Sequence, residues 1–304
     1  MNVLVTGITG YIGSRLVPRL QRDGHDVRGF SRHAEGAPAG VTIVTGDAVS
    51  GAGLDRALDG VEVAYFLIHS MERSADGSFD AREHAAAENF AREAAAAGVG
   101  RIVYLGGVVP SSGRISRHLA SRLAVENVLL SGAPGSVAFR ASIVIGAHSR
   151  SFRFLVRLVE RLPVMALPAW HSNRTRPIDE RDVVEFLARA ATSERVTGKS
   201  LDLGGPDTVT YGELIDRIAD LMLVARPSIS FQRLTVTPIA SRIASVIADE
   251  DWDLIGPLME SLDTDLLPRD DEAAHLLGVR LHSLDRAIEH ALAEWEATEP
   301  LAAR

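Results

Sequence analysis

The most constraining feature of the chain is a short apolar strand that runs into three glycines and then into a helix. The strand covers Val3–Val5, and the glycines are Gly7, Gly10 and Gly13. The first glycine permits a tight turn, the second lets the backbone approach a pyrophosphate, and the third lets helix and strand pack closely. Free N–H groups at the start of such a helix attract phosphates. The residues expected to bind a dinucleotide here are Gly7, Thr9, Gly10, Tyr11 and Ile12. The alternative is a glycine turn that binds no ligand.

Short apolar runs alternate with helical patterns through the first two thirds of the chain. We expect strands at Val3–Val5, Asp26–Phe30, Thr42–Val44, Val61–Ile68, Arg101–Leu105, Ser136–Phe139 and Ser200–Leu203. We expect helices at Ser14–Asp23, Leu54–Leu58, Phe79–Ala97, Leu119–Leu130, Ser151–Leu162 and Arg181–Ala191. Near-continuous apolar strands that alternate with helices predict an α/β fold, with a doubly wound parallel sheet of the Rossmann type and helices on both faces.

The chain is predicted to divide into two regions. Residues 1–150 form the dinucleotide-binding Rossmann domain, and residues 179–205 return to it. Residues 151–178 and 206–304 form a smaller C-terminal α+β region on the substrate side, including a lid.

Several elements are expected within this second region. Pro163–Pro177 has the composition of a loop, and Thr210 followed by Glu213 predicts a capped helix to Leu223. A strand is expected at Ile229–Val236, and further helices are expected near Ile239–Ala248, Trp252–Ser261, Glu272–Leu277 and Leu284–Trp295.

Residues 236–262 have two competing interpretations. They contain two short amphipathic pieces around the acidic sequence Asp249-Glu250-Asp251. One interpretation is a mobile lid that shields a nicotinamide from water. The other is ordinary packing against the main domain.

Composition excludes several classes of function. The 304 residues include 32 Lys+Arg and 40 Asp+Glu, a net charge of −8 that repels nucleic acid. The absence of cysteine excludes disulfides and thiolate chemistry, and Lys199 is the single lysine. We expect neither a signal peptide nor a membrane span, because the first residues lack a basic, then apolar pattern and no uncharged apolar run approaches roughly 20 residues. We therefore expect a cytoplasmic monomer or homodimer that acts on a small molecule, with no membrane or nucleic-acid partner.

Five segments together resemble the extended and atypical short-chain dehydrogenase/reductases, including the NmrA-like group. They are the TGxxGxxG turn, Gly46-Asp47-Ala48, Tyr104-Leu105-Gly106-Gly107, Arg140–Gly146 and Arg176–Val183, and the resemblance covers roughly residues 1–205. It implies a Rossmann fold that binds NAD(P). The further cofactor-binding residues expected at the ends of the strands are Asp47, Ala48, Leu67, His69, Gly106, Gly107, Ala141, Ser142 and Ile143.

The end of the second strand indicates which dinucleotide is bound. An NAD enzyme usually places a carboxylate there to bind the ribose hydroxyls. This chain has Ser31 and Arg32 at that position, whereas Asp26 lies at the beginning of the strand. A hydroxyl and a guanidinium suit a 2′-phosphate, so NADP(H) is favoured over NAD(H). The alternative is an ordinary solvated arginine.

The usual catalytic pair of the resembled family is missing. Those reductases use Tyr-x-x-x-Lys with an upstream Ser, but no tyrosine here is followed four residues later by lysine. His118 and Arg122 have the same i, i+4 spacing near the expected position, as in atypical members with His-x-x-x-Arg. His118 is a candidate proton donor near neutral pH, and Arg122 a candidate ribose ligand. The alternative is that His118 caps or lines the helix start while Arg122 only holds the cofactor.

Other polar residues also allow two interpretations. His69 follows the fourth strand and is expected either to contact the nicotinamide or to anchor its loop. Trp170, His171, Arg174 and Arg176 form a loop that either binds an anionic substrate or is simply solvated. The ten histidines show no HExxH-like spacing, so we expect no metal.

Two functions from different classes follow. One is NADPH-dependent reduction of a small carbonyl, enone, or quinone- or flavin-like acceptor. The other is a non-catalytic NADP(H)-binding sensor or assembly factor of the NmrA-like type, which the missing Tyr and Lys favour. Sugar-nucleotide epimerase chemistry is disfavoured because the catalytic tyrosine is absent.

Overall fold

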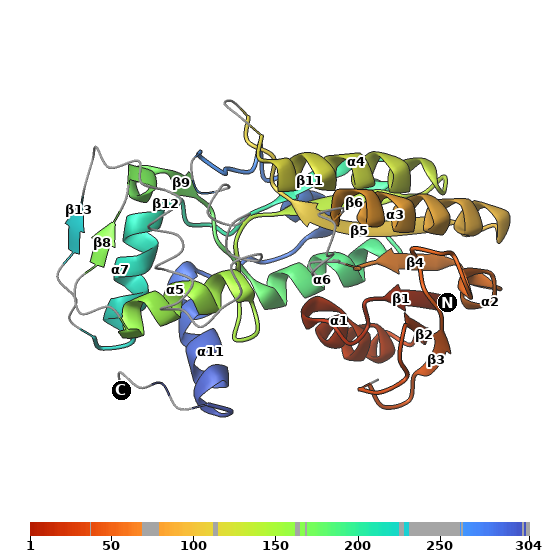
Figure 1. The fold of residues 1–304 in the computed structure, drawn as a ribbon, viewed down its shortest axis with the longest axis horizontal. Helices are drawn as coiled ribbons and strands as arrows, with labels where there is room; N and C mark the ends of the chain where they lie inside the picture. Colours follow the sequence, from red (N-terminus) through yellow and green to blue (C-terminus); the bar gives the residue numbers. More distant parts are fainter. Residues whose placement is uncertain are drawn as a thin grey trace.

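A seven-stranded parallel sheet is the scaffold of the computed structural model, with strand order β11-β6-β5-β4-β1-β2-β3 (Figure 1). The structure describes residues 1–36, 38–68, 79–111, 115–161, 165–167, 169–224, 228–230, 262, 264–299 and 301. The sheet strands are β1 (Asn2–Thr6), β2 (Asp26–Ser31), β3 (Thr42–Thr45), β4 (Val63–Phe66), β5 (Arg101–Gly107), β6 (Val137–Ala141) and β11 (Ser200–Leu203). The strand order reverses direction between β1 and β4, which is where such sheets bind ligands.

The middle strands are apolar throughout because helices cover both faces of the sheet. In β1, Val3 and Val5 pack with α1 and α6 on one face, whereas Leu4 packs with the helices of the opposite face. These layers are visible in Figure 1. The helices of the sheet region are α1 (Tyr11–Arg22), α2 (Leu54–Leu58), α3 (Phe79–Ala96), α4 (Arg117–Ser131), α6 (Glu180–Ala190) and α10 (Glu272–Leu277).

A third core cluster lies beyond the carboxyl ends of the sheet strands (Figure 1). It is built from three amphipathic helices, whose buried side chains include Phe152, Leu155 and Trp295. These helices are α5 (Arg150–Arg161), α7 (Tyr211–Leu221) and α11 (Leu284–Glu296). Three two-stranded pairings accompany them: β7 (Val144–Ile145) with β10 (Ile178–Asp179), β9 (Arg174–Thr175) with β12 (Val209–Thr210), and β8 (Met165–Leu167) with β13 (Ser228–Ser230). Two short 3₁₀ helices complete the elements, at Ala169–Ser172 and Glu194–Val196.

The predicted α/β fold with a parallel Rossmann sheet is confirmed. The predicted return of the chain to the sheet is also correct, because α6 packs beside α1 and β11 pairs with β6. The capping box is present, since the Thr210 hydroxyl accepts from the Glu213 N–H and the Glu213 carboxylate accepts from the Thr210 N–H.

The structure also corrects some element boundaries. Helix α1 begins at Tyr11 rather than Ser14, because Gly10 rather than a polar side chain occupies the N-cap position. The predicted loop Pro163–Pro177 contains β8, a 3₁₀ turn and β9. Helix α10 packs against α6 and β11, although it follows α5 and α7 in sequence.

Parts of the predicted C-terminal region lie outside the described residues. These are the strand beyond Ser230, the helices near 239–248 and 252–261, and all of the predicted lid 236–262 except Leu262. Within the described residues, none of the helices has both the length and the hydropathy that a membrane span requires.

The close packing of α1 on β1 makes a testable prediction. A Cβ on Gly13 would lie 2.3 Å from the carbonyl oxygen of Gly7, which is backbone and cannot move aside. We expect Gly13→Ala to lower the free energy of unfolding by roughly 1–3 kcal/mol, measured by urea denaturation. A Cβ on exposed Gly100 would meet nothing closer than 3.4 Å, so Gly100→Ala is the matched control. Equal stability of the two variants would contradict the packing argument.

Candidate dinucleotide and substrate site

The glycine turn places uncapped N–H groups at the carboxyl end of β1. Gly7 adopts φ +64°, which favours glycine, and its carbonyl accepts from the N–H of Gly10 at 2.9 Å. Gly10 is the N-cap of α1 and has no side chain to bond the first-turn N–H groups. The positive end of α1 is therefore available to an anion.

This turn opens into a cavity of about 950 Å³, which lies against the carboxyl ends of the strands. Nearly all of the predicted site residues line it. They are Gly7, Thr9, Gly10, Tyr11, Ile12, Ser31, Arg32, Asp47, Ala48, Leu67, Gly106, Gly107, His118, Arg122, Ala141, Ser142 and Ile143. His69 lies outside the described residues. The volume suits a dinucleotide with a small second ligand.

One end of the cavity is formed by the end of β2 and the loop after β3. Ser31 and the exposed Arg32 line it, and the Ser31 hydroxyl accepts a bond from the His33 N–H at 3.4 Å. Asp47 folds back on its own loop, because its Oδ1 accepts from the Val49 N–H at 3.0 Å. Among the described residues that line the cavity, Asp47 is the single acidic one. A guanidinium and a hydroxyl at this end match the predicted 2′-phosphate contacts.

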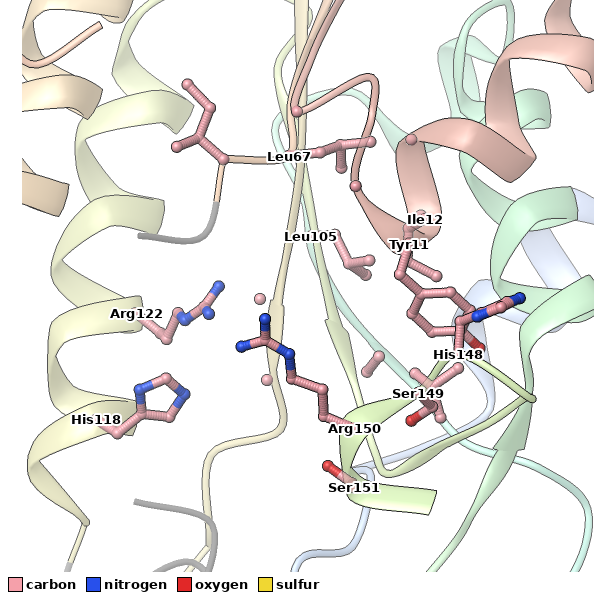
Figure 2. Close-up of a pocket in the computed structure, with 18 of the residues that line it drawn as sticks. Tyr11, Ile12, Leu67, Leu105, His118, Arg122, His148, Ser149, Arg150 and Ser151 are labelled. Atoms are coloured by element: carbon pink, nitrogen blue, oxygen red, sulfur yellow. The ribbon is translucent and has the colours of Figure 1, made fainter. Parts of the chain in front are cut away.

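His118 and Arg122 lie one turn apart on α4, and both point into the cavity (Figure 2). The N-cap of α4 is Ser116, whose hydroxyl accepts from the Leu119 N–H at 3.3 Å. His118 therefore does not cap the helix. The alternative that His118 only lines the cavity stays open.

Arg122 is buried beside a carboxylate. Its Nε lies 3.7 Å from Glu83 Oε1, and the Glu83 side chain is fully buried. Burial raises the pKa of Glu83, and the Arg122 charge opposes that rise. Glu83 fixes Arg122 at the cavity wall and partly offsets its charge.

The surroundings of His118 disfavour its protonated form. Burial, with a contribution from the Arg122 guanidinium, lowers the pKa of His118 to about 4. The imidazole is therefore neutral at pH 7. This conflicts with the expectation of a protonated donor near neutral pH, because tertiary burial overrides the ordinary pKa of histidine. A neutral imidazole still donates a hydrogen bond through its N–H group.

This charge state makes a second prediction. The His118 ring C–H resonance should not titrate between pH 5 and 8 and should shift only near pH 4, as followed by NMR with His118→Gln as the assignment control. The unfolded chain takes up this proton near pH 6.5, so His118 reduces stability as the pH falls from there towards 4. A midpoint at or above pH 6.5 would contradict the assignment.

The four tyrosines do not replace the missing catalytic pair. Tyr65 donates to the Leu187 carbonyl at 2.8 Å, and Tyr104 donates to the Arg122 carbonyl at 3.4 Å. Tyr211 lines the cavity, and burial raises its pKa to about 12. Lys199 pairs with Glu272, away from the residues that line the cavity.

Tyr11 belongs to a polar cluster behind the phosphate turn. Its hydroxyl donates to Glu180 Oε2 at 2.5 Å, and burial raises the pKa of Tyr11. Arg15 contacts both Glu180 and Glu294 of α11. This cluster ties the turn to the C-terminal helix, and no local sequence pattern indicates it.

The same cluster contains three groups of the metal-ligating type. Ligand atoms of Glu180, His290 and Glu294 lie within 4.8 Å of one another. These residues are far apart in sequence, so a search for ligand spacing does not find them. The Arg15 guanidinium already supplies positive charge to both carboxylates. The expectation of no metal stays a prediction.

The aromatic, basic loop does not contribute to the cavity. Trp170 is buried against Tyr211, with ring centroids 6.1 Å apart. Arg174 pairs with Asp265, and Arg176 pairs with Asp271. Because both guanidinium groups are paired within the chain, the anion-binding interpretation of this loop is not supported.

Several residues that line the cavity were missed by sequence reasoning. Among them are Arg82, His148, Ser149, Arg150, Ser151, Phe154, Leu155, Tyr211, Leu262 and Leu266. Residues 148–151 come soon after the Arg140–Gly146 segment, which was the available signal. The others belong to segments whose packing only the fold determines.

Comparison with known proteins agrees with a nucleotide-binding site at the glycine turn. Residues 7–127 match the family model described as NAD(P)H-binding. The matched part of the chain is similar to NAD(P)H-binding domains. A short-chain dehydrogenase/reductase superfamily protein from Agrobacterium tumefaciens with bound NAD aligns with a TM-score of 0.73 at 20% identity, over 98% of both chains. UDP-glucose 4-epimerase from Thermotoga maritima aligns with a TM-score of 0.74 at 14% identity, over 98% and 99%. The chain therefore shares its fold with these two solved structures.

Similar proteins have diverse names. Uncharacterised proteins of Mycobacterium bovis and Mycobacterium tuberculosis are 24% identical over 83% of this chain, which spans only 28% of their length. Subunit 9 of the NADH dehydrogenase 1 alpha subcomplex of Arabidopsis thaliana is 25% identical, covering 72% of this chain and 57% of that protein. A ceramide reductase of Caulobacter vibrioides is 28% identical, covering 54% and 52%. These names assign no substrate to this chain.

Proposed function

We propose that this chain is an NADPH-dependent oxidoreductase of the atypical short-chain dehydrogenase/reductase type. Its acceptor would be a small carbonyl, enone, or quinone- or flavin-like compound. The observation that carries the proposal is one continuous cavity, which is lined by the phosphate turn, Arg32, His118 and Arg122. The uncapped start of α1 and the missing side chain at Gly10 fit a dinucleotide.

The bound nicotinamide would supply a hydride to the acceptor carbon. The carbonyl electrons then move to the oxygen, which takes a proton derived from solvent. The neutral His118 imidazole would donate a hydrogen bond to that oxygen and orient the acceptor. The Arg122 cation would stabilise developing negative charge and hold the ribose. The apolar side chains Phe154 and Leu155 would exclude water.

A non-catalytic NADP(H)-binding sensor or assembly factor is the second candidate. It is favoured by the absence of a tyrosine–lysine pair at the cavity and by the similarity to a respiratory complex subunit. Incubation with NADPH and a panel of carbonyls and quinones separates the two. Loss of the reduced-nicotinamide absorbance supports the reductase, and binding without turnover across the panel supports the sensor.

The phosphate turn makes the third prediction. A valine side chain at position 10 would project into the space expected for the pyrophosphate. We expect Gly10→Val to reduce NADP(H) affinity at least about 100-fold while the protein stays folded, as measured by calorimetry and circular dichroism. Retained affinity would show that the cofactor binds elsewhere.

The cofactor preference makes the fourth prediction. Arg32→Asp replaces a charge-assisted phosphate contact by repulsion, so the affinity for NADP(H) should fall roughly tenfold or more, and that for NAD(H) should stay similar or improve. Arg286→Asp, an exposed change on α11 outside the cavity, is the matched control. An equal loss for both cofactors would refute the assignment of the 2′-phosphate to Arg32.

A further inference from the structure

The described lining of the cavity is cationic although the chain is acidic overall. The chain has a net charge of −8, yet the described residues that line the cavity include four arginines and the single acidic residue Asp47. The arginines are Arg32, Arg82, Arg122 and Arg150. A cavity of one sign within a protein of the opposite sign concentrates ligands of complementary charge. The ligands of this cavity are therefore anions.

Arg150 differs from the arginines whose roles are proposed above. Its side chain donates no hydrogen bond and forms no ion pair in the part of the chain that the structure describes, whereas Arg122 is held by Glu83. Figure 2 shows the Arg150 guanidinium extending into the cavity towards Arg122 and His118. An unpaired guanidinium at the catalytic end is available to a second ligand beside the cofactor.

The wall next to Arg150 is apolar. Phe154 and Leu155 lie one turn further along α5, and both line the cavity with buried side chains. Tyr211, Leu262 and Leu266 line it from the other C-terminal segments. The neighbouring Ser151 adds a hydroxyl that points into the same space (Figure 2). This part of the cavity combines a cation, a hydroxyl and a hydrophobic surface.

We propose that the acceptor is an apolar oxo acid, whose acidic group is bound by Arg150 and whose apolar body packs on Phe154 and Leu155. This rests on the proposed function, because the oxo group is what the hydride reduces. The planar guanidinium matches a carboxylate through two parallel N–H···O bonds. The acidic group would thereby direct the oxo carbon towards His118. Arg150 is a substrate-positioning residue in this arrangement.

The same cation could serve the cofactor pyrophosphate instead, so the experiment must separate the two anions. Calorimetry of the full chain saturated with NADP⁺ provides the assay, with decanoate as the probe and decanol as its uncharged counterpart. The oxidised cofactor prevents turnover, so only binding is measured. The variants are Arg150→Gln, Arg150→Lys, Arg82→Gln and the exposed control Arg286→Gln.

The expected result is loss of decanoate binding by at least about tenfold in Arg150→Gln, with partial retention in Arg150→Lys. NADP⁺ and decanol affinities should be unchanged in both variants. Arg82→Gln and Arg286→Gln should bind decanoate like the parent protein.

Three outcomes would overturn the proposal. In the first, the parent protein binds decanoate no better than decanol. In the second, Arg150→Gln lowers the affinity for NADP⁺ as much as the affinity for decanoate. In the third, Arg82→Gln rather than Arg150→Gln lowers the affinity for decanoate. The proposed reductase activity can fail separately. If Arg150 binds decanoate but no oxo acid is turned over, the anion site is supported and the reductase activity is contradicted.

Discussion

The close approach of two glycines is the contact on which the site depends. The Gly7 carbonyl oxygen lies only 2.3 Å from the point that a Cβ on Gly13 would occupy, so α1 packs directly on the end of β1. A Cβ on Gly7 would lie 2.5 Å from the Leu67 carbonyl oxygen, so the end of β1 also lies close to the residue that follows β4. With no side chains between these elements, the first-turn N–H groups of α1 face the opening at the strand-order reversal. The cavity begins at this point.

The second organising feature is the contrast in charge between the chain and its cavity. The chain carries a net charge of −8, whereas the described residues that line the cavity include four arginines and one carboxylate. An anionic dinucleotide is thus attracted to the cavity by the local field rather than by the net charge. Burial, with a contribution from the Arg122 guanidinium, lowers the pKa of His118 to about 4 and keeps the imidazole neutral. Arg122 therefore also affects the chemistry available to the imidazole.

Much of the cofactor half could be predicted because it depends on residues that are close in sequence. The glycine turn, the Ser31-Arg32 strand end and the i, i+4 spacing of His118 and Arg122 are local patterns, and the structure brings them to one cavity. The charge state of His118 could not be predicted, since the desolvation that lowers its pKa comes from the packed surroundings. The exclusion of the Trp170–Arg176 loop likewise follows from ion pairs with residues some 90 positions away.

The sequence by itself determined the alternation of strands and helices, the parallel sheet and the phosphate turn. The hydrophobic periodicity and the conformational freedom of glycine act over a few residues, so both can be recognised from the sequence alone. Only the tertiary structure decided that α5, α7 and α11 share one apolar core and that Arg150 is directed at His118 and Arg122 (Figure 2). It also decided that Tyr11, Glu180 and Glu294 form one cluster. Such contacts depend on how separately specified helices dock, which is governed by shape and burial across the whole chain rather than by spacing within any one segment.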